Sequence, residues 1–323
     1  MKCLFEGCGV ALATPFINNK VDYISLKKLI EHCIAGNVDA IIVLGTTGEA
    51  STISFKERAK IIKLAKKIIQ NNSCNESKKC KNMPKSNEFK DKITKNKNKP
   101  IKLIVGTGSN NLTICEKLTD QAKQLGADGV LIVTPYYNKT TQEGIIKFYD
   151  QLAKKQIPII MYNVPSRTGL NIEIDTMKKI VDHNPMIYGI KESNPNIDHI
   201  IALHKSCKNK IAIYSGEDHL NYIFYCLGAS GTISVTANII PDVVKNLYQL
   251  TNKNQIEEAK KLYFNIMEIN KSLFLETNPI PIKYALKRLD IIKSDEVRPP
   301  LTTTSSATKK AITTAINNII LPQ

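Results

Sequence analysis

A lysine stands at the end of a short apolar segment. The run Met186-Ile187-Tyr188-Gly189-Ile190 is β-like and leads directly into Lys191. A charged amine is costly to bury in an apolar core, so a lysine at this position suits chemistry better than packing. An amine that has lost its charge can attack a carbonyl carbon and form an imine. The segment therefore indicates covalent catalysis on a ketone.

Proton donors and a second cation follow other strand-like runs. The run 157–162 ends in Tyr162 and enters a segment that contains Arg167. An imine acidifies the neighbouring methyl group and yields an enamine nucleophile, and each of these steps moves a proton. The hydroxyls of Tyr162, Thr46 and Tyr137 could pass protons along a hydrogen-bonded chain. The planar guanidinium of Arg167 offers a fork for a carboxylate.

Polar and glycine-rich segments gather after the apolar runs. They are 45–49, 106–110, 134–138, 162–163, 191, 215–218 and 236–238. The motif Gly45–Glu49 offers hydroxyls and backbone N–H groups just before a helix, which suits a carboxylate, although a plain strand-to-helix turn explains this motif alone equally well. Lys191 and Tyr162 also have structural explanations when taken singly. Their joint appearance with the threonine pair and Tyr136-Tyr137 at four strand ends favours chemistry.

Eight apolar runs must position these groups. They are 8–13, 40–44, 101–105, 129–133, 157–162, 187–191, 211–214 and 231–235, and they are continuous rather than alternating. Such runs are typical of parallel strands buried on both faces. Segments of helical period lie between them, as in 25–36, 54–70 and 112–125, with Ser25 as a candidate cap and Ser54-x-x-Glu57 as a capping box. The pattern predicts an α/β fold of the (β/α)8 TIM-barrel type. A doubly wound open sheet would need a phosphate-binding glycine motif near its first turn, and none is present there.

The remainder of the chain divides into an insertion and a C-terminal extension. Residues 71–99 are rich in Lys, Asn and Ser, so they predict a mobile loop, either a tolerated surface insertion or a tether for a nucleic acid or partner. We expect residues 1–240 to form the barrel with this insertion. Residues 241–323 would contain the last barrel helix and three further helices, at 254–276, 280–289 and 305–320.

Composition narrows the classes of function. The 323 residues carry a net charge of +16, but the excess is spread along the chain beside abundant Asn and Ile, which indicates compositional drift rather than a nucleic-acid site. No apolar run is long enough for a membrane span, and the N-terminus lacks a secretion signal, so we expect a cytoplasmic protein with neither nucleic acid nor membrane as partner. The eight cysteines form no metal-binding or paired pattern, so we expect reduced thiols and no metal.

Several motifs together resemble the 4-hydroxy-tetrahydrodipicolinate synthase (dihydrodipicolinate synthase) family. They are Gly45–Glu49, Val133–Asn138, Tyr162–Gly169, Gly189–Glu192 and Gly231–Asn238. The resemblance covers nearly the whole chain except 71–99. It implies condensation of pyruvate with L-aspartate 4-semialdehyde, the committed step of lysine biosynthesis through diaminopimelate, in a homotetramer (a dimer of dimers) without a required cofactor.

The same resemblance implies a role for each site residue. Lys191 would form the Schiff base with pyruvate, and Tyr162, Thr46 and Tyr137 would form the proton relay, with Tyr137 reaching in from a neighbouring subunit. Thr47, together with Thr46, would hold the carboxylate of pyruvate. Arg167 would bind the carboxylate of the semialdehyde. Gly216 and Ile233 would line the pocket.

The chain departs from the family pattern in the 71–99 insertion and at four positions. These are Ala50, Phe55, Arg58 and Ile114, whereas lysine-inhibited members usually have histidines at the second and third positions and an acid at the fourth. Hydrophobic side chains cannot hold a lysine ammonium group, so we expect weak or absent inhibition by lysine, unless another contact compensates.

Two other functions compete with this hypothesis. A related pyruvate-dependent aldolase such as N-acetylneuraminate lyase would share Lys191 and Tyr162, but those aldolases usually have no arginine in the segment where Arg167 stands. A non-catalytic basic binding protein on the same barrel would be expected to have lost Lys191 or Tyr162, and both are present.

Overall fold

The computed structural model describes residues 1–81 and 100–319, and its main feature is a closed barrel of eight parallel strands. The strands are β1 (Gly7–Ala11), β4 (Ala40–Val43), β5 (Lys102–Gly106), β6 (Gly129–Val133), β7 (Ile159–Asn163), β8 (Ile187–Glu192), β9 (Ala212–Ser215) and β10 (Gly231–Ser234). Each pairs with its neighbour along the chain, and β10 closes on β1. The predicted (β/α)8 barrel and its eight strands are confirmed, with ends shifted by a few residues.

Alternation along each strand separates an inner from an outer core. Ile160 and Tyr162 belong to the cluster inside the barrel, whereas Ile159 and Met161 pack with the layer of helices. This period of two is the geometry of a pleated strand buried on both faces. A residue that ends a strand in the inner register therefore points into the barrel at its carboxyl rim.

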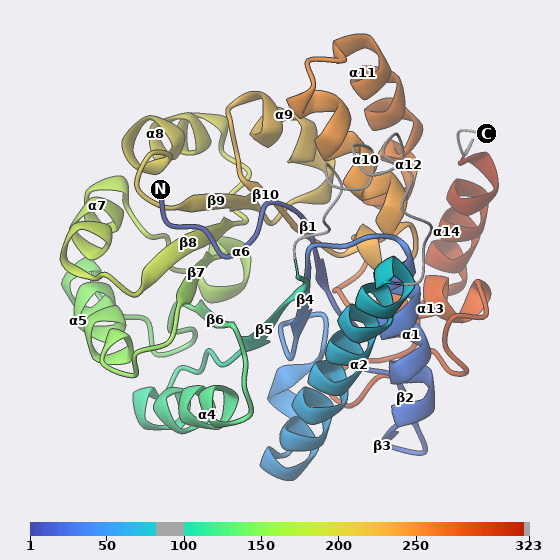
Figure 1. The fold of residues 1–323 in the computed structure, drawn as a ribbon, viewed down its shortest axis with the longest axis horizontal. Helices are drawn as coiled ribbons and strands as arrows, with labels where there is room; N and C mark the ends of the chain where they lie inside the picture. The colour runs from blue at the N-terminus through green and yellow to red at the C-terminus, as the bar shows by residue number, and fades with distance from the viewer. Residues whose placement is uncertain (82–99, 320–323) are drawn as a thin grey trace.

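Helices surround the barrel (Figure 1). They are α1 (Tyr23–Ala35), α2 (Phe55–Lys81), α4 (Leu112–Gln124), α5 (Gln142–Ala153), α7 (Ile174–His183), α8 (Ile197–Cys207), α9 (Asn221–Cys226) and α10 (Pro241–Asn252), with the short α6 (Pro165–Thr168) after β7. A two-stranded hairpin, β2 (Phe16–Ile17) and β3 (Lys20–Val21), follows β1. Short 3₁₀ turns occur at Ala50–Thr52, Asp218–Leu220 and Thr236–Asn238. No helix within residues 1–81 and 100–319 is long and apolar enough to cross a membrane.

Helix starts test the predicted caps. The capping box of α2 is confirmed, because the Ser54 backbone N–H donates to the Glu57 carboxylate at 2.9 Å and the Glu57 N–H donates to Ser54 Oγ at 3.3 Å. The predicted cap of α1 is wrong: Asp22 accepts hydrogen bonds from the N–H groups of Ile24 and Ser25. Ser25 is buried instead, and its hydroxyl accepts from the Lys293 N–H.

Two other predictions need correction. Helix α2 continues to Lys81, so residues 71–81 are helical where a loop was predicted, while 82–99 lie outside the described residues. The segment predicted as one helix over 254–276 forms two, α11 (Ile256–Asn265) and α12 (Met267–Ser272), which meet at Ile266. The helices α13 (Ile280–Arg288) and α14 (Ser306–Asn318) agree with the prediction. Figure 1 shows α11 to α14 gathered on one side of the barrel.

A buried ion pair joins this C-terminal extension to the barrel. Lys283 on α13 pairs with Glu49, which follows β4, and both side chains are almost fully buried. Glu49 also accepts a hydrogen bond of 2.9 Å from the Arg298 N–H. Burial lowers the pKa of Lys283 to about 8. Removal of either partner would leave a buried, unpaired charge, so the pair fixes the extension against the β4 rim.

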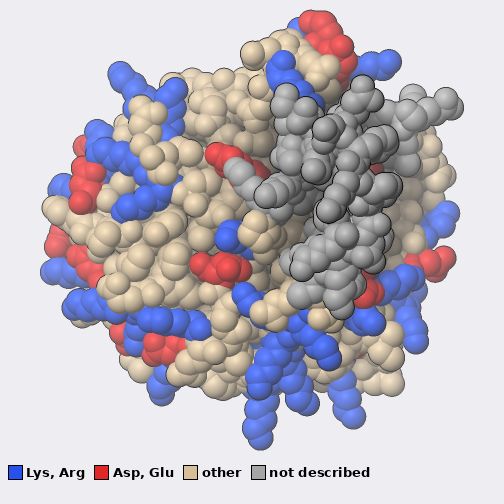
Figure 2. Space-filling view, in the orientation of Figure 1, with Lys and Arg blue, Asp and Glu red and all other residues tan. Residues whose placement is uncertain are grey.

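The positive charge is dispersed on the face that Figure 2 shows. Lys and Arg side chains lie around the edge of this face, with Asp and Glu side chains between them. Exposed pairs such as Lys27 with Glu31 and Lys178 with Asp175 mix the two signs further. No single basic patch dominates this view.

Candidate functional site

The register of two neighbouring strands brings Lys191 beside Tyr162. Tyr162 on β7 is the pairing partner of Lys191 on β8, and both residues are buried. The Lys191 ammonium nitrogen lies 4.4 Å from the centre of the Tyr162 ring. The ring face therefore contacts the amine, and the tyrosine hydroxyl belongs to the same end of the barrel. This arrangement places an amine beside a phenol ring at the carboxyl rim, where barrel enzymes carry out their chemistry.

Gly216 leaves space next to the Lys191 side chain. The Gly216 N–H donates to the Glu192 carbonyl oxygen at 2.7 Å. A Cβ at position 216 would fall 2.9 Å from Lys191 Cε and 2.0 Å from Ser193 Oγ, so a larger residue would displace both side chains. Ile233 on β10 belongs to the inner barrel cluster that also holds Tyr162. Gly216 therefore adjoins Lys191, and Ile233 lies in the inner core of the barrel; that they line a substrate pocket stays a prediction.

The threonine pair and the arginine meet through a residue that the sequence analysis missed. Thr47 is buried and Thr46 half-buried in the loop after β4. The Asn278 side chain donates to Thr47 Oγ1 at 2.9 Å, while the Asn278 carbonyl oxygen accepts from the Arg167 guanidinium at 3.2 Å. Asn278 comes from the C-terminal extension, between α12 and α13. No spacing to the strand ends could have identified it.

Asn278 also presents an unused acceptor. Its Oδ1 is buried and has no hydrogen-bond partner within residues 1–81 and 100–319. A buried polar atom of this kind is costly unless a ligand or water satisfies it. Asn278 is therefore a further candidate for a substrate contact.

Tyr137 does not join this cluster within one chain. Its side chain is 92% exposed, and its backbone is held at a φ of +70° in the loop after β6. Other large apolar side chains are exposed on adjoining elements, namely Phe55 on α2 and Ile114 on α4. Helices α2 and α4 touch through a 3.0 Å hydrogen bond from Gln121 to the Phe55 carbonyl oxygen. The Tyr137 side chain therefore faces outward in the single chain, whereas Tyr162 and Lys191 are buried.

A buried carboxylate fixes the strand that carries Lys191. Glu192 is fully buried and accepts hydrogen bonds from the Asn163 amide at 3.0 Å and from the Asn194 N–H at 2.7 Å. His199 Nε2 lies 3.2 Å from the same carboxylate. These bonds join the ends of β7 and β8 and limit movement of Tyr162 and Lys191.

A second acid, Glu217, also lies at the site and was not among the predicted residues. Burial raises the pKa of Glu217 to about 7, although the charges of Lys191 and Arg167 act in the opposite direction. Its carboxyl is therefore within electrostatic reach of both cations. The sequence signal was its place one residue after Gly216, but an acid in a loop is common.

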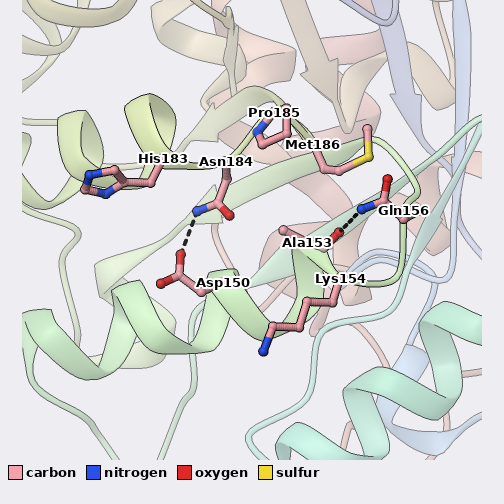
Figure 3. A pocket seen from close by; sticks show the side chains of 8 residues that line it. All are labelled: Asp150, Ala153, Lys154, Gln156, His183, Asn184, Pro185 and Met186. Carbon is pink, nitrogen blue, oxygen red and sulfur yellow. Dashed lines mark hydrogen bonds between the residues drawn. The ribbon is translucent and has the colours of Figure 1, made fainter.

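A hollow at the other end of the barrel is unrelated to this site. It has a volume of about 330 Å³ and is lined by Asp150, Ala153, Lys154, Gln156, His183, Asn184, Pro185 and Met186. These residues come from the ends of α5 and α7 and the segments before β7 and β8, as Figure 3 shows. Asn184 donates to Asp150 at 2.6 Å within it. The amino ends of barrel strands serve stability rather than catalysis.

Comparison with known proteins identifies the family of the chain. The model of the dihydrodipicolinate synthetase family matches residues 4–73 and 83–319. The chain belongs to this family. A 4-hydroxy-tetrahydrodipicolinate synthase of Thermodesulfovibrio yellowstonii is 39% identical over 310 residues, which cover 96% of each chain.

Solved structures of the dihydrodipicolinate synthetase family share the fold along nearly the whole chain. Dihydrodipicolinate synthase from Aquifex aeolicus is 37% identical with a TM-score of 0.86, and the match covers 99% of this chain and 100% of that one. A monomeric dihydrodipicolinate synthase variant is 34% identical with a TM-score of 0.87, covering 98% of this chain and 97% of the variant.

The raised pKa of Glu217 predicts a pH-dependent effect on stability. The folded protein binds this proton more tightly than the unfolded chain does. Ionisation of Glu217 therefore lowers the free energy of unfolding as the pH rises from about 4.5, and the loss is complete above about pH 7. Below about pH 4.5 the loss vanishes. We expect Glu217→Gln to raise the free energy of unfolding at pH 8 by up to about 3 kcal/mol, and by less at pH 5.

Denaturant unfolding of both proteins at the two pH values measures this effect. Glu143→Gln is the matched control, because its side chain is 65% exposed and lies away from the site. An equal effect at pH 5 and pH 8, or a destabilised variant at pH 8, would contradict the prediction.

Proposed function

We propose that the chain acts as a 4-hydroxy-tetrahydrodipicolinate synthase and condenses pyruvate with L-aspartate 4-semialdehyde through a Schiff base on Lys191. The observation that carries the proposal is the buried Lys191 amine over the Tyr162 ring at the carboxyl rim of the barrel. Relatives that share 36–40% identity over nearly the full chain are named for this activity. The product leads toward lysine through diaminopimelate.

The first half of the reaction activates pyruvate. The free amine of Lys191 attacks the ketone carbon, water leaves, and an imine forms. Loss of a methyl proton then gives the enamine, whose carbon attacks the aldehyde of the second substrate. Tyr162, Thr46 and Tyr137 would carry the protons in these steps. The enclosed barrel rim limits competing protonation of the enamine by bulk water.

The remaining residues would bind the two carboxylates. Thr47 and Thr46 lie in the turn after β4, where hydroxyls and N–H groups suit the carboxylate of pyruvate. Arg167 would bind the carboxylate of the semialdehyde bidentately. Asn278 touches both Thr47 and Arg167, so it can set the distance between the two carboxylate sites. Gly216 and Ile233 would line the space between them.

Tyr137 is exposed in the single chain, so we also propose that it enters the site of a neighbouring subunit in a homotetramer built as a dimer of dimers. The exposed Tyr137, Phe55 and Ile114 side chains support an apolar contact between copies on this side of the barrel. In a two-fold interface each subunit would give its Tyr137 to the site of the other.

Covalent trapping tests the central step. Borohydride added with pyruvate should reduce the imine and add the mass of the pyruvate adduct to the peptide that contains Lys191. Lys191→Arg keeps the charge but cannot form this imine, so trapping should disappear and activity should fall by about 10⁴-fold or more. Peptide mass spectrometry locates the adduct. An adduct on a different lysine, or full activity of the arginine variant, would refute the proposal.

Subunit mixing tests the position of Tyr137. Tyr137→Phe alone should lose about 10²- to 10⁴-fold in rate through the broken relay. When this variant is dissociated and reassociated with Lys191→Arg, each hybrid pair should contain one intact site. Random pairing should then restore about a quarter of wild-type activity. The parents, treated separately, are the controls, and a mixture no more active than its parents would place Tyr137 outside the neighbour's site.

Inhibition by lysine should be weak or absent. Phe55 and Ile114 are both about half exposed and offer no polar group, and Arg58 is buried with its guanidinium bonded to the Gly106 carbonyl oxygen. We expect a dissociation constant for lysine weaker than about 1 mM, which corresponds to less than ~4 kcal/mol of binding. Assays across a lysine titration measure this, and half-inhibition at micromolar lysine would show that another contact binds the effector.

A further inference from the structure

Two adjacent acids follow β9, and only one of them has a structural explanation. Asp218 is buried and accepts hydrogen bonds from the N–H groups of Val235 and Thr236 at 2.8 and 2.9 Å and from the Asn221 amide at 3.1 Å. Its carboxylate is fully used in holding the end of β10. Glu217 has no comparable set of donors.

The backbone of Glu217 is fixed while its carboxyl remains available. The Glu217 N–H donates to Ser215 Oγ at 3.3 Å, and the Ser215 hydroxyl donates to the Glu217 carbonyl oxygen at 3.1 Å. His219 Nδ1 lies 3.7 Å from the carboxyl, and burial lowers the pKa of that histidine, which disfavours its charged form. The Glu217 side chain is 21% exposed. Within the described residues this half-buried acid has a fixed backbone and fewer donors on its carboxyl than Asp218, so the carboxyl is available to a ligand.

A buried hydroxyl beside Glu217 is also unused. Ser193 Oγ is buried and has no partner of ordinary hydrogen-bond geometry in the described part of the chain, although it lies near enough to the Glu217 carboxyl to lower its pKa. The space that a Cβ on Gly216 would take is bordered by this hydroxyl and by Lys191 Cε. Ser193, Glu217 and the reactive amine thus share one wall of the site.

The second substrate has a cationic group that an acid suits best. L-Aspartate 4-semialdehyde carries an aldehyde, a carboxylate and an α-ammonium group. Arg167 repels an ammonium group, and the hydroxyl residues and Asn278 Oδ1 offer only neutral acceptors, whereas a carboxylate also supplies the opposite charge. Glu217 is an acid that senses the charges of both Arg167 and Lys191. An ammonium group next to a carboxylate held by Arg167 would therefore face Glu217.

We propose that Glu217 binds the α-ammonium group of the second substrate and accepts its proton before ring closure. The inference rests on the proposed function and assigns a residue to the second half of that reaction, in which the ring closes. After the carbon–carbon bond has formed, the substrate ammonium gives one proton to the Glu217 carboxylate. The freed amine attacks the carbon that is bound to Lys191 Nζ, and a new carbon–nitrogen bond closes the ring.

The same step releases the enzyme. A proton passes from the ring nitrogen to Nζ, the carbon–Nζ bond breaks with its electron pair on Nζ, and Lys191 leaves as a neutral amine. The ring nitrogen forms a double bond to the same carbon, so no oxidant or reductant is needed. Glu217 returns its proton to solvent. A carboxyl whose pKa is raised toward neutrality is well matched to take and release a proton at physiological pH.

Glu217→Gln and Glu217→Asp, with Glu143→Gln as an exposed control, test this assignment. For the Gln variant we expect borohydride trapping with pyruvate and the KM for pyruvate to stay within about twofold, because ring closure comes later. The kcat/KM for L-aspartate 4-semialdehyde should fall about 10²- to 10³-fold. The Asp variant keeps the negative charge, although Gln fits the space better. Its kcat/KM for the semialdehyde should be at least about tenfold higher than that of the Gln variant.

An aldehyde without the amino group separates recognition from general damage. The inhibition constant of 4-oxobutanoate, which lacks only the α-amino group, should change by less than about twofold in Glu217→Gln. An equal loss for both aldehydes, a Gln variant more active than the Asp variant, or an unchanged kcat/KM for the semialdehyde would each overturn the inference while leaving the proposed function intact. Absence of trapping in the wild-type protein would instead overturn the proposed function, and this inference with it.

Discussion

The pairing of Tyr162 with Lys191 across β7 and β8 is the constraint on which the rest of the site depends. Side chains alternate between the inside and the outside of the barrel, so a slip of one residue would turn one of the two away from the other. Closure of the barrel fixes this register, since neither strand has a free edge along which to shift. The buried Glu192, bonded to Asn163 of the neighbouring strand, adds a second lock at the same level. The geometry of the amine therefore follows from the topology of the whole barrel.

The barrel alone does not complete the rim. Asn278 connects Thr47 after β4 with Arg167 after β7, and it belongs to a segment more than a hundred residues further along the chain than either. The buried pair of Lys283 with Glu49 and the bond from Arg298 to Glu49 hold that segment against the barrel. Side chains placed by such supporting contacts keep the geometry that catalysis needs. The C-terminal helices thus have a positional role in the site as well as a part in the packing.

Local patterns predicted what depends on local physics. Continuous apolar runs predicted the strands, and their ends brought Lys191 and Tyr162 together, because parallel strands in a barrel share one rim. The family resemblance, rather than the apolar pattern, supplied Gly216 and Ile233. The cap of α1 was missed since both Asp22 and Ser25 are good caps, and burial of Ser25 decided between them. Asn278 could not be predicted, because its contacts depend on how the extension folds back over the barrel. The segment 71–81 has few large apolar residues and is helical as the continuation of α2, which its composition alone did not indicate.

Glu217 and Asp218 are adjacent in one loop but have opposite effects on stability. Asp218 uses its carboxylate to satisfy backbone N–H groups that β10 would otherwise leave buried, so it stabilises the folded chain. Glu217 is placed where burial disfavours its charge, which costs stability near neutral pH. A residue that serves packing alone gains nothing from such a position, since a neutral side chain of the same size would cost less. Of the two acids, the one that costs stability is Glu217, which lies near the Lys191 amine, and a ligand that brings a positive charge would remove that cost.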